Sequence, residues 1–291
     1  MKFEHILFPV DFSERTARLN PSVEWMATHF GSRVTLIHVV EIPSNWYGAS
    51  DAPLLTAESF QAISESANSR LRDYAIRLPE NRVQRVLAED ETAGHITSWA
   101  KEHGVDLIMM GTHGYGRIRG LLLGSVASKV IHDAECPVWT DSLLHPHTDG
   151  QQHRISSILC AVDIDAETVP LLRFAGQIAA EFKAPVHILH AVPEAESRPG
   201  KYFDFDLHRY LTESAQGEIA KLQQEAGTAF PVEVSGQAIS TAVSEIALQK
   251  QCDLVLIGRG QAQKRLGYLR THAYQIIRDA PCPVLSYLPN R

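Results

Sequence analysis

The sequence has few cysteines, no long apolar run and no excess of positive charge. Its 291 residues include only four cysteines, and no two of them form a C-x-x-C pair. Such sparse cysteine usage is typical of a reducing compartment and excludes a dense disulfide framework. No apolar run reaches the roughly 18 residues needed to span a bilayer. The N-terminal segment does not resemble a signal peptide, because Glu4 and Asp11 flank its short apolar stretch. We therefore expect a cytoplasmic protein with no membrane partner.

Catalytic signatures are also scarce. The chain contains no G-x-S-x-G, H-E-x-x-H or C-x-x-C-H motif and no Walker A loop. No convergent set of acid and base residues stands out, so we assign no catalytic and no metal-ligating residue and do not expect strong catalysis. The formal net charge of −7 argues against a nucleic-acid partner.

What the chain does contain is an internal duplication. An apolar strand that ends in aspartate occurs at Asp11 and again at Asp163, 152 residues later. The segment Cys136-Pro137-Val138 returns as Cys282-Pro283-Val284, 146 residues later. A slowly drifting offset of this size is typical of a duplicated domain and is far too long for a solenoid repeat.

The boundaries of the two domains follow from this duplication. At roughly 150 residues per domain, a chain of this length is expected to form two domains. We place them at residues 1–141 and 154–291. The polar stretch 142–153 lacks hydrophobic periodicity and contains turn-forming residues, so we interpret it as a linker.

Each repeat alternates short apolar runs with helical patterns. In the first repeat we expect five strands, at 3–10, 33–40, 83–88, 107–110 and 137–140. Ser13 is expected to cap the first helical stretch, and Asn20-Pro21 either restarts that helix or bends it. Such alternation predicts an α/β fold with a parallel sheet and helices on both faces. Ligands of these folds bind beyond the carboxyl ends of the strands, where the strand order reverses.

A glycine-punctuated loop is the most informative motif in the chain. Gly111 ends an apolar strand, Gly114 follows after two residues, and Gly124-Ser125 comes nine residues later, immediately before a helical pattern. Glycines let main-chain N–H groups approach phosphate oxygens, and a helix N-terminus adds unpaired donors. The spacing does not fit the dinucleotide signature G-x-G-x-x-G. We interpret the loop as an anion cradle rather than as plain turn chemistry.

Several residues near this loop admit two interpretations. Asp11 either holds the ribose hydroxyls or adenine edge of a nucleotide, or serves as a helix N-cap. His38 and His113 are more typical of structural histidines than of catalytic ones. Arg117 and Arg119 either meet phosphates or solubilise the loop.

The second repeat breaks the cradle. Gln261 stands in the place of Gly114, and Arg270 stands in the place of Gly124. A long side chain at the mouth of the helix obstructs close approach of a phosphate. We therefore expect that this repeat does not bind a triphosphate in the manner of the first. Its basic residues either fill the vacant site or bind a different anion; they are Arg259, Lys264, Arg265 and Arg270.

With these residues and its duplication, the chain resembles a tandem, two-domain member of the universal stress protein family. Its ATP-binding members carry the pattern that Gly111, Gly114, Gly124 and Ser125 match in full. The segment from Pro9 through Val10 and Asp11 to Ser13 is also similar to the start of the family's domain, and the Cys-Pro-Val segments are similar to its end. The resemblance implies two Rossmann-like, adenine nucleotide alpha hydrolase-like domains. Each is then a five-stranded parallel sheet of order 3-2-1-4-5 with helices on both faces.

The resemblance also implies a ligand and a site. It implies ATP, or else AMP or ADP, in the first repeat, and Mg²⁺ or Mn²⁺ is expected to accompany a triphosphate because its charges need a counterion. Asp11 is then at the adenosine, Val39 and Met110 line the base or ribose pocket, and the glycine loop holds the phosphates. The predicted site residues are Pro9, Val10, Asp11, Val39, Met110, Gly111, Gly114, Gly124, Ser125 and Val126.

The predicted function is a nucleotide-binding stress response, sensing rather than strongly catalytic, with one competent site. Two alternatives stay open. One is slow ATP hydrolysis or nucleotidyl transfer at the same loop, for which His113 is the obvious base. The other is a scaffold with no ligand, in which both loops are only turns. Because family members pair through their last strands, the resemblance also implies an internal pseudo-dimer of the two halves and a homodimer of two chains.

Overall fold

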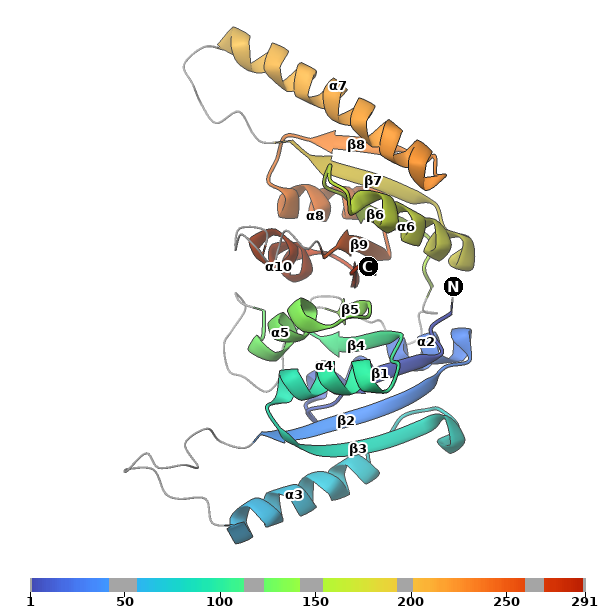
Figure 1. The fold of residues 1–291 in the computed structure, drawn as a ribbon, viewed down its shortest axis with the longest axis vertical. Helices are drawn as coiled ribbons and strands as arrows, with labels where there is room; N and C mark the ends of the chain where they lie inside the picture. The colour runs from blue at the N-terminus through green and yellow to red at the C-terminus, as the bar shows by residue number, and fades with distance from the viewer. Residues whose placement is uncertain are drawn as a thin grey trace, which may run out of the picture. The chain divides into compact units, whose positions relative to one another are not determined.

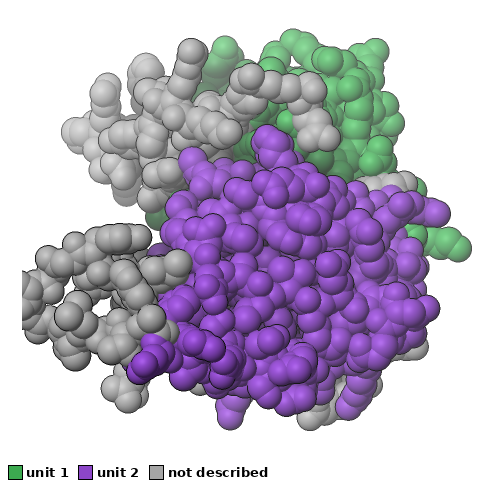
Figure 2. All heavy atoms as spheres, turned by 60° about the horizontal axis from the view of Figure 1, so that its bottom comes forward, with its two compact units in different colours: residues 1, 139–291 green, residues 2–138 purple. Residues whose placement is uncertain are grey.

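The structure is a computed structural model that describes residues 2–41, 57–112, 123–141, 154–192, 201–259 and 270–289. The chain divides into two compact units, Lys2–Val138 and Trp139–Arg291, which Figure 2 shows in purple and green. The linker predicted at 142–153 lies outside the described residues.

The first repeat alternates strands and helices as the apolar pattern predicts (Figure 1). Its strands are β1 (His5–Pro9), β2 (Arg33–Glu41), β3 (Val83–Asp90), β4 (Leu107–Gly111) and β5 (Val138–Asp141). Its helices are α1 (Glu14–Ala17), α2 (Asn20–Phe30), α3 (Ala57–Arg72), α4 (Thr92–Glu102) and α5 (Ser125–Asp133), with a 3₁₀ turn at Glu80–Arg82. The sheet order is β3-β2-β1-β4-β5.

The second repeat has the same order of elements. Its strands are β6 (Ile158–Ala161), β7 (Val186–Ala191), β8 (Val232–Ser235), β9 (Leu254–Gly258) and β10 (Val284–Tyr287). Its helices are α6 (Thr168–Phe182), α7 (Lys201–Ala226), α8 (Ile239–Gln249) and α10 (Arg270–Asp279). The sheet order β8-β7-β6-β9-β10 repeats that of the first unit. The predicted fold of two α/β repeats with strand order 3-2-1-4-5 is confirmed.

The strands are buried on both faces, which is why they are apolar runs rather than alternating patterns. Ile6, Leu7 and Phe8 in β1 are all fully buried, and so are Leu107 and Ile108 in β4. These two strands pair in parallel, with Ile6 opposite Leu107 and Leu7 opposite Ile108. The core of the repeat therefore lies at the strands whose ends carry the predicted site.

Local signals set the ends of the two helices between β1 and β2. Ser13 caps α1 and accepts a hydrogen bond from the Thr16 main-chain N–H. A second helix, α2, then begins at Asn20 with Pro21 in its first turn, so the restart, rather than a bend, is what the structure shows. Gly31 ends α2 with a left-handed φ of 70°, a conformation that glycine adopts without penalty.

The sheet order brings together the ends of the strands that carry the predicted site residues. β1 lies between β2 and β4, and it pairs in parallel with both. From β1 the chain passes through α1 and α2 to β2, which lies on one side of β1 in the sheet. From β4 it passes through α5 to β5, which lies farther out on the other side. The reversal point therefore lies between Asp11, after β1, and Gly111, at the end of β4. Open α/β sheets place ligands in such a crevice.

Candidate functional site

The carboxylate of Asp11 is held on one side by the turn that follows β1. Its Oδ1 atom accepts hydrogen bonds from the Ser13 N–H at 2.9 Å, the Ser13 hydroxyl at 2.6 Å and the Thr16 hydroxyl at 2.5 Å. Thr16 is buried, and Asp11 and Ser13 are half-buried. Three donors on a single oxygen fix the orientation of the whole carboxylate.

The other carboxylate oxygen of Asp11 has no such partner. Oδ2 is buried from solvent and has no hydrogen-bond partner in the described part of the chain. A buried carboxylate oxygen without a partner is costly, because it has given up hydration without compensation. The N-cap interpretation of Asp11 is wrong, because Ser13 is the N-cap of α1 and Oδ1 of Asp11 instead orients the Ser13 hydroxyl. Oδ2 remains able to accept hydrogen bonds.

The backbone after Asp11 takes a conformation that bulky residues rarely adopt. Phe12 has a φ of 59°, in the left-handed region. Its ring lies 4.3 Å from the His38 ring, and the guanidinium carbon of Arg70 lies 4.5 Å from its centroid. These contacts hold the strained residue in place. The turn at Phe12 lets the Ser13 N–H reach back to the Asp11 carboxylate.

His38 ties the end of β2 to the end of β1. Its Nδ1 lies 2.7 Å from the Val10 carbonyl oxygen, and because a carbonyl can only accept, Nδ1 carries the proton. Burial is the main reason why the pKa of His38 is lowered from its usual value, so the ring is neutral at pH 7. The structure thus gives His38 a structural contact with the peptide that precedes Asp11.

The glycine loop is closed at its base by one hydrogen bond. The Gly124 N–H donates to the Thr112 carbonyl oxygen at 2.9 Å, which joins the residue after β4 to the N-cap of α5. Within the helix, the Ser128 N–H donates to the Gly124 carbonyl. The N–H groups of Ser125 and Val126 have no acceptor among the described residues. They are the donors that α5 presents at this edge.

The remaining predicted site residues lie at the same strand ends or outside the described part of the chain. Pro9 is half-buried at the end of β1, and Gly111 ends β4. Val10, Val39 and Met110 are buried, at 3%, 8% and 6% exposure. Gly114 and His113 lie outside the described residues, as do Arg117, Arg119, Gln261, Lys264 and Arg265.

The equivalent turn of the second repeat is built differently. Thr168 occupies the place of Thr16, but its hydroxyl donates to the Asp163 main-chain carbonyl and to Asp165 Oδ1. Asp165 stands where the first repeat has Ser13, and it also accepts from the Glu167 N–H at 3.0 Å. Desolvation and the nearby Asp165 raise the pKa of Asp163, although its side chain keeps contact with solvent. His190 preserves the histidine contact, 2.8 Å from the Val162 carbonyl.

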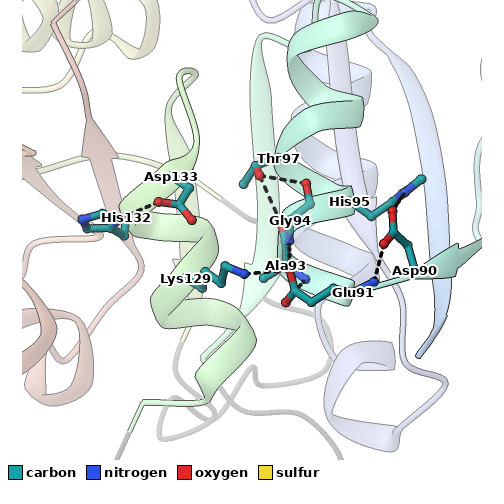
Figure 3. Close-up of polar contacts among 9 residues, drawn as sticks. All are labelled: Asp90, Glu91, Ala93, Gly94, His95, Thr97, Lys129, His132 and Asp133. Carbon is teal, nitrogen blue, oxygen red and sulfur yellow. Dashed lines mark hydrogen bonds and ion pairs between the residues drawn. The ribbon is translucent and has the colours of Figure 1, made fainter. Parts of the chain in front are cut away.

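Two features of the site escaped sequence reasoning. No local signal marks Phe12 as left-handed, because aromatic residues rarely adopt that conformation. The ion pair between Glu91 and Lys129, 2.7 Å long, joins residues 38 positions apart and has no sequence signature (Figure 3). The sequence could have indicated that pair only through comparison of the two repeats, because both of its members are replaced in the second repeat.

Comparison with known proteins identifies the fold family. A model of the universal stress protein family matches residues 2–140 and again residues 155–287. The chain belongs to the universal stress protein family. The resemblance and the tandem arrangement that the sequence motifs predict are thereby confirmed.

Individual universal stress proteins match one repeat or both. A universal stress protein of Methanocaldococcus jannaschii is 27% identical over 150 residues, which cover 47% of this chain and 93% of that protein. One of Mycobacterium tuberculosis is 34% identical over 131 residues, which cover 44% of this chain and 38% of that protein. The crystal structure of a universal stress protein from Archaeoglobus fulgidus has a TM-score of 0.68 at 18% identity, and the match covers 99% of this chain and 97% of that one. That last likeness concerns the fold.

The residues that the structure describes also bear on metal binding and on membrane insertion. Among them, no group of three or more histidine, cysteine, aspartate or glutamate residues is arranged to hold a metal ion. No helix in the described ranges is long and apolar enough to cross a membrane.

Proposed function

We propose that the first repeat of this universal stress protein binds an adenine nucleotide and that the protein uses this binding in a stress response, without strong catalysis. The observation that carries the proposal is the buried Oδ2 of Asp11, which lacks a partner among the described residues and lies after the strand next to β4. A desolvated acceptor calls for a donor, and the hydroxyls of a ribose or the amino group of adenine supply one.

The phosphates occupy the other side of the reversal point in this proposal. Gly111 and Thr112 lead out of β4, and the Thr112–Gly124 hydrogen bond sets where α5 begins. Because the Gly124 N–H is used in that bond, the Ser125 and Val126 N–H groups are the donors offered to phosphate, and the Ser125 side chain is exposed at the same place. Gly124 contributes by keeping a side chain away from the mouth of the helix.

The base or ribose then rests against apolar residues at the ends of the central strands, namely Pro9, Val10, Val39 and Met110. Gly114 completes the cradle. ATP is the proposed ligand, with ADP and AMP as competitors of lower charge. Mg²⁺ or Mn²⁺ enters with the triphosphate, whose phosphate charges need a counterion.

The experiment is to identify the small molecules released from freshly purified full-length protein by mass spectrometry, with Gly124→Arg as the comparison. The substitution copies Arg270, the residue that the second repeat carries at this position. We expect an adenine nucleotide in the wild type and none in the variant. Equal amounts of nucleotide in both proteins would place the site elsewhere. A wild type that neither retains nor binds added ATP, ADP or AMP would favour the scaffold.

Slow ATP hydrolysis or nucleotidyl transfer remains the alternative from the enzyme class. It requires a base near the transferred phosphate, and His113 is the candidate by its place in the loop. Turnover that His113→Ala abolishes while nucleotide binding persists would favour that alternative. We also propose that the two repeats pair as an internal pseudo-dimer and that two chains form a homodimer. Light scattering after gel filtration tests the homodimer through its molar mass.

A further inference from the structure

An ion pair joins the two helices that begin at the ligand edge of the first repeat. Glu91 is the N-cap of α4, and Lys129 lies in α5, which runs beside α4 (Figure 3). The Lys129 Nζ is 2.7 Å from Glu91 Oε2. Because α4 follows β3 and α5 follows β4 in a parallel sheet, both helices start at the same edge. That edge carries Asp11 and the proposed phosphate cradle.

Glu91 is fixed before it meets the lysine. Its carboxylate accepts hydrogen bonds from the Ala93 N–H at 3.2 Å and the Gly94 N–H at 2.8 Å. A Cβ atom at Gly94 would lie 2.6 Å from Glu91 Oε2, so glycine is what allows this close packing. The hydrogen bond from Lys129 is the leading cause of a lowered pKa for Glu91 and, in return, of a raised pKa for Lys129. Both groups are therefore charged at neutral pH.

The second repeat lacks the whole arrangement. Its α8 has the same length as α4 and lies 147 positions later in the chain. The N-cap of α8 is Ala238, where α4 has Glu91. Thr241 stands in the place of Gly94, and Gln275 stands in the place of Lys129. The carboxylate, the glycine beneath it and the ammonium group are all gone from the repeat whose cradle is broken.

A second ion pair between the same helices supplies a control. Lys101, in the last turn of α4, contacts Glu135, just after α5, at 2.6 Å. This pair is also missing from the second repeat, where Leu248 and Pro281 occupy the two positions. Loss between repeats therefore does not by itself indicate a role at the site. What distinguishes the two pairs is their location: Glu91 is the N-cap of α4, whereas Lys101 lies in its last turn and Glu135 lies beyond the end of α5.

Distance gives the pair at Lys129 its influence on an anion. Lys129 is four residues from Ser125, which is roughly 6 Å along a helix axis. Its ammonium group is held against Glu91, the N-cap of α4, at the edge of the sheet where both helices begin (Figure 3). The rise of about 6 Å along the helix axis between Ser125 and Lys129 is shorter than the Debye length of about 8 Å at physiological ionic strength. Solvent ions therefore screen the charge of Lys129 only in part.

We propose that Lys129 is a specificity-determining residue of the nucleotide site, and this inference rests on the proposed function above. Its charge favours ligands in proportion to the number of their phosphates. Glu91 holds the lysine in place and, by its own negative charge, limits that preference. The pair thereby sets how strongly the first repeat selects ATP over AMP, with adenosine unaffected.

The test measures the binding of ATP, ADP, AMP and adenosine to the full chain by calorimetry. Lys129→Gln, which copies the second repeat, should weaken ATP binding by about fivefold, AMP binding by less and adenosine binding not at all. Glu91→Gln keeps one of the two acceptor oxygens of the α4 cap and removes the negative charge, so it should tighten ATP binding by about twofold. Lys129→Arg should keep the wild-type order of affinities for the four ligands, and Lys101→Gln should leave all four affinities unchanged.

The opposite signs of the two central variants separate this account from a structural one. If the pair only braced the helices, Lys129→Gln and Glu91→Gln would both weaken every ligand, adenosine included, and that result would overturn the proposal. Unchanged ATP affinity in both variants, in a protein that binds ATP, would also overturn it. A wild type that binds none of the four ligands would refute the proposed function itself and this inference with it.

Discussion

The two repeats carry the same strand-ending aspartate in turns of different construction. Asp11 has one carboxylate oxygen fixed by three donors and the other buried without a partner among the described residues. In the second repeat, the hydroxyl of Thr168, which stands in the place of Thr16, donates to the main-chain carbonyl of Asp163 rather than to its carboxylate. A single replacement explains much of the difference, because Asp165 in the place of Ser13 exchanges a donor for a second negative charge. Similar folds can thus present one chemical group as a prepared acceptor or as a carboxylate that the hydroxyl of the turn does not contact.

The largest effect is expected at the prepared acceptor. Asp11→Asn keeps Oδ1 for the three donors of the turn and replaces Oδ2 with an amide that donates. We expect a loss of ATP affinity of about 10- to 100-fold, since hydrogen bonds to charged groups contribute roughly 1.5–3 kcal/mol. Titration calorimetry measures the change.

The matched control is Asp163→Asn in the second repeat, which should leave ATP affinity as it is in the wild type. Equal losses in the two variants would show that both repeats take part. No loss in Asp11→Asn would remove the role proposed for its carboxylate.

A smaller effect is expected from the donor that orients Asp11. Ser13→Ala removes the α1 cap and the 2.6 Å bond to Oδ1, so the free energy of unfolding should fall by about 1 kcal/mol. ATP affinity should fall as well, by less than in Asp11→Asn, because the Ser13 N–H and Thr16 still hold the carboxylate. Denaturant unfolding with and without ATP separates the two effects; a loss of stability with unchanged affinity would mean that the orientation of Asp11 does not matter for binding.

The smallest expected effect is a pH-dependent gain in stability from Asp163→Asn. Desolvation and Asp165 raise the pKa of Asp163 in the folded state, so folding disfavours its charged form. The wild type should therefore lose stability as the pH rises from the usual aspartate pKa, about 3.9, through the raised value. The variant should unfold at a higher temperature than the wild type at pH 7. That difference should vanish below the usual pKa, and a variant less stable than the wild type at pH 7 would contradict this prediction.

Much of the fold could be predicted from the sequence because it depends on local patterns. The apolar runs of β1 and β4, the Ser13 cap and the Asn20-Pro21 restart are signals carried by neighbouring residues. The repeat itself revealed that the glycine loop is intact in one half only. Family resemblance, rather than composition or spacing, supplied the strand order.

The rest depends on contacts between distant residues, which single-sequence patterns do not encode. Phe12 adopts its left-handed conformation against His38 and Arg70, which lie in other elements of the repeat. The use of the Gly124 N–H by the Thr112 carbonyl also became visible only in the structure, and it removes that N–H from the predicted phosphate donors, which leaves Ser125 and Val126 at the start of α5. The division of labour between the two oxygens of Asp11 is a similar case.

In our proposal, one repeat is prepared for a nucleotide and the other is not. Equilibrium dialysis of the full-length chain against labelled ATP, carried to saturation, measures this directly as the number of nucleotides bound per chain. The account predicts one site per chain. Two sites of equal affinity, or none, would contradict it.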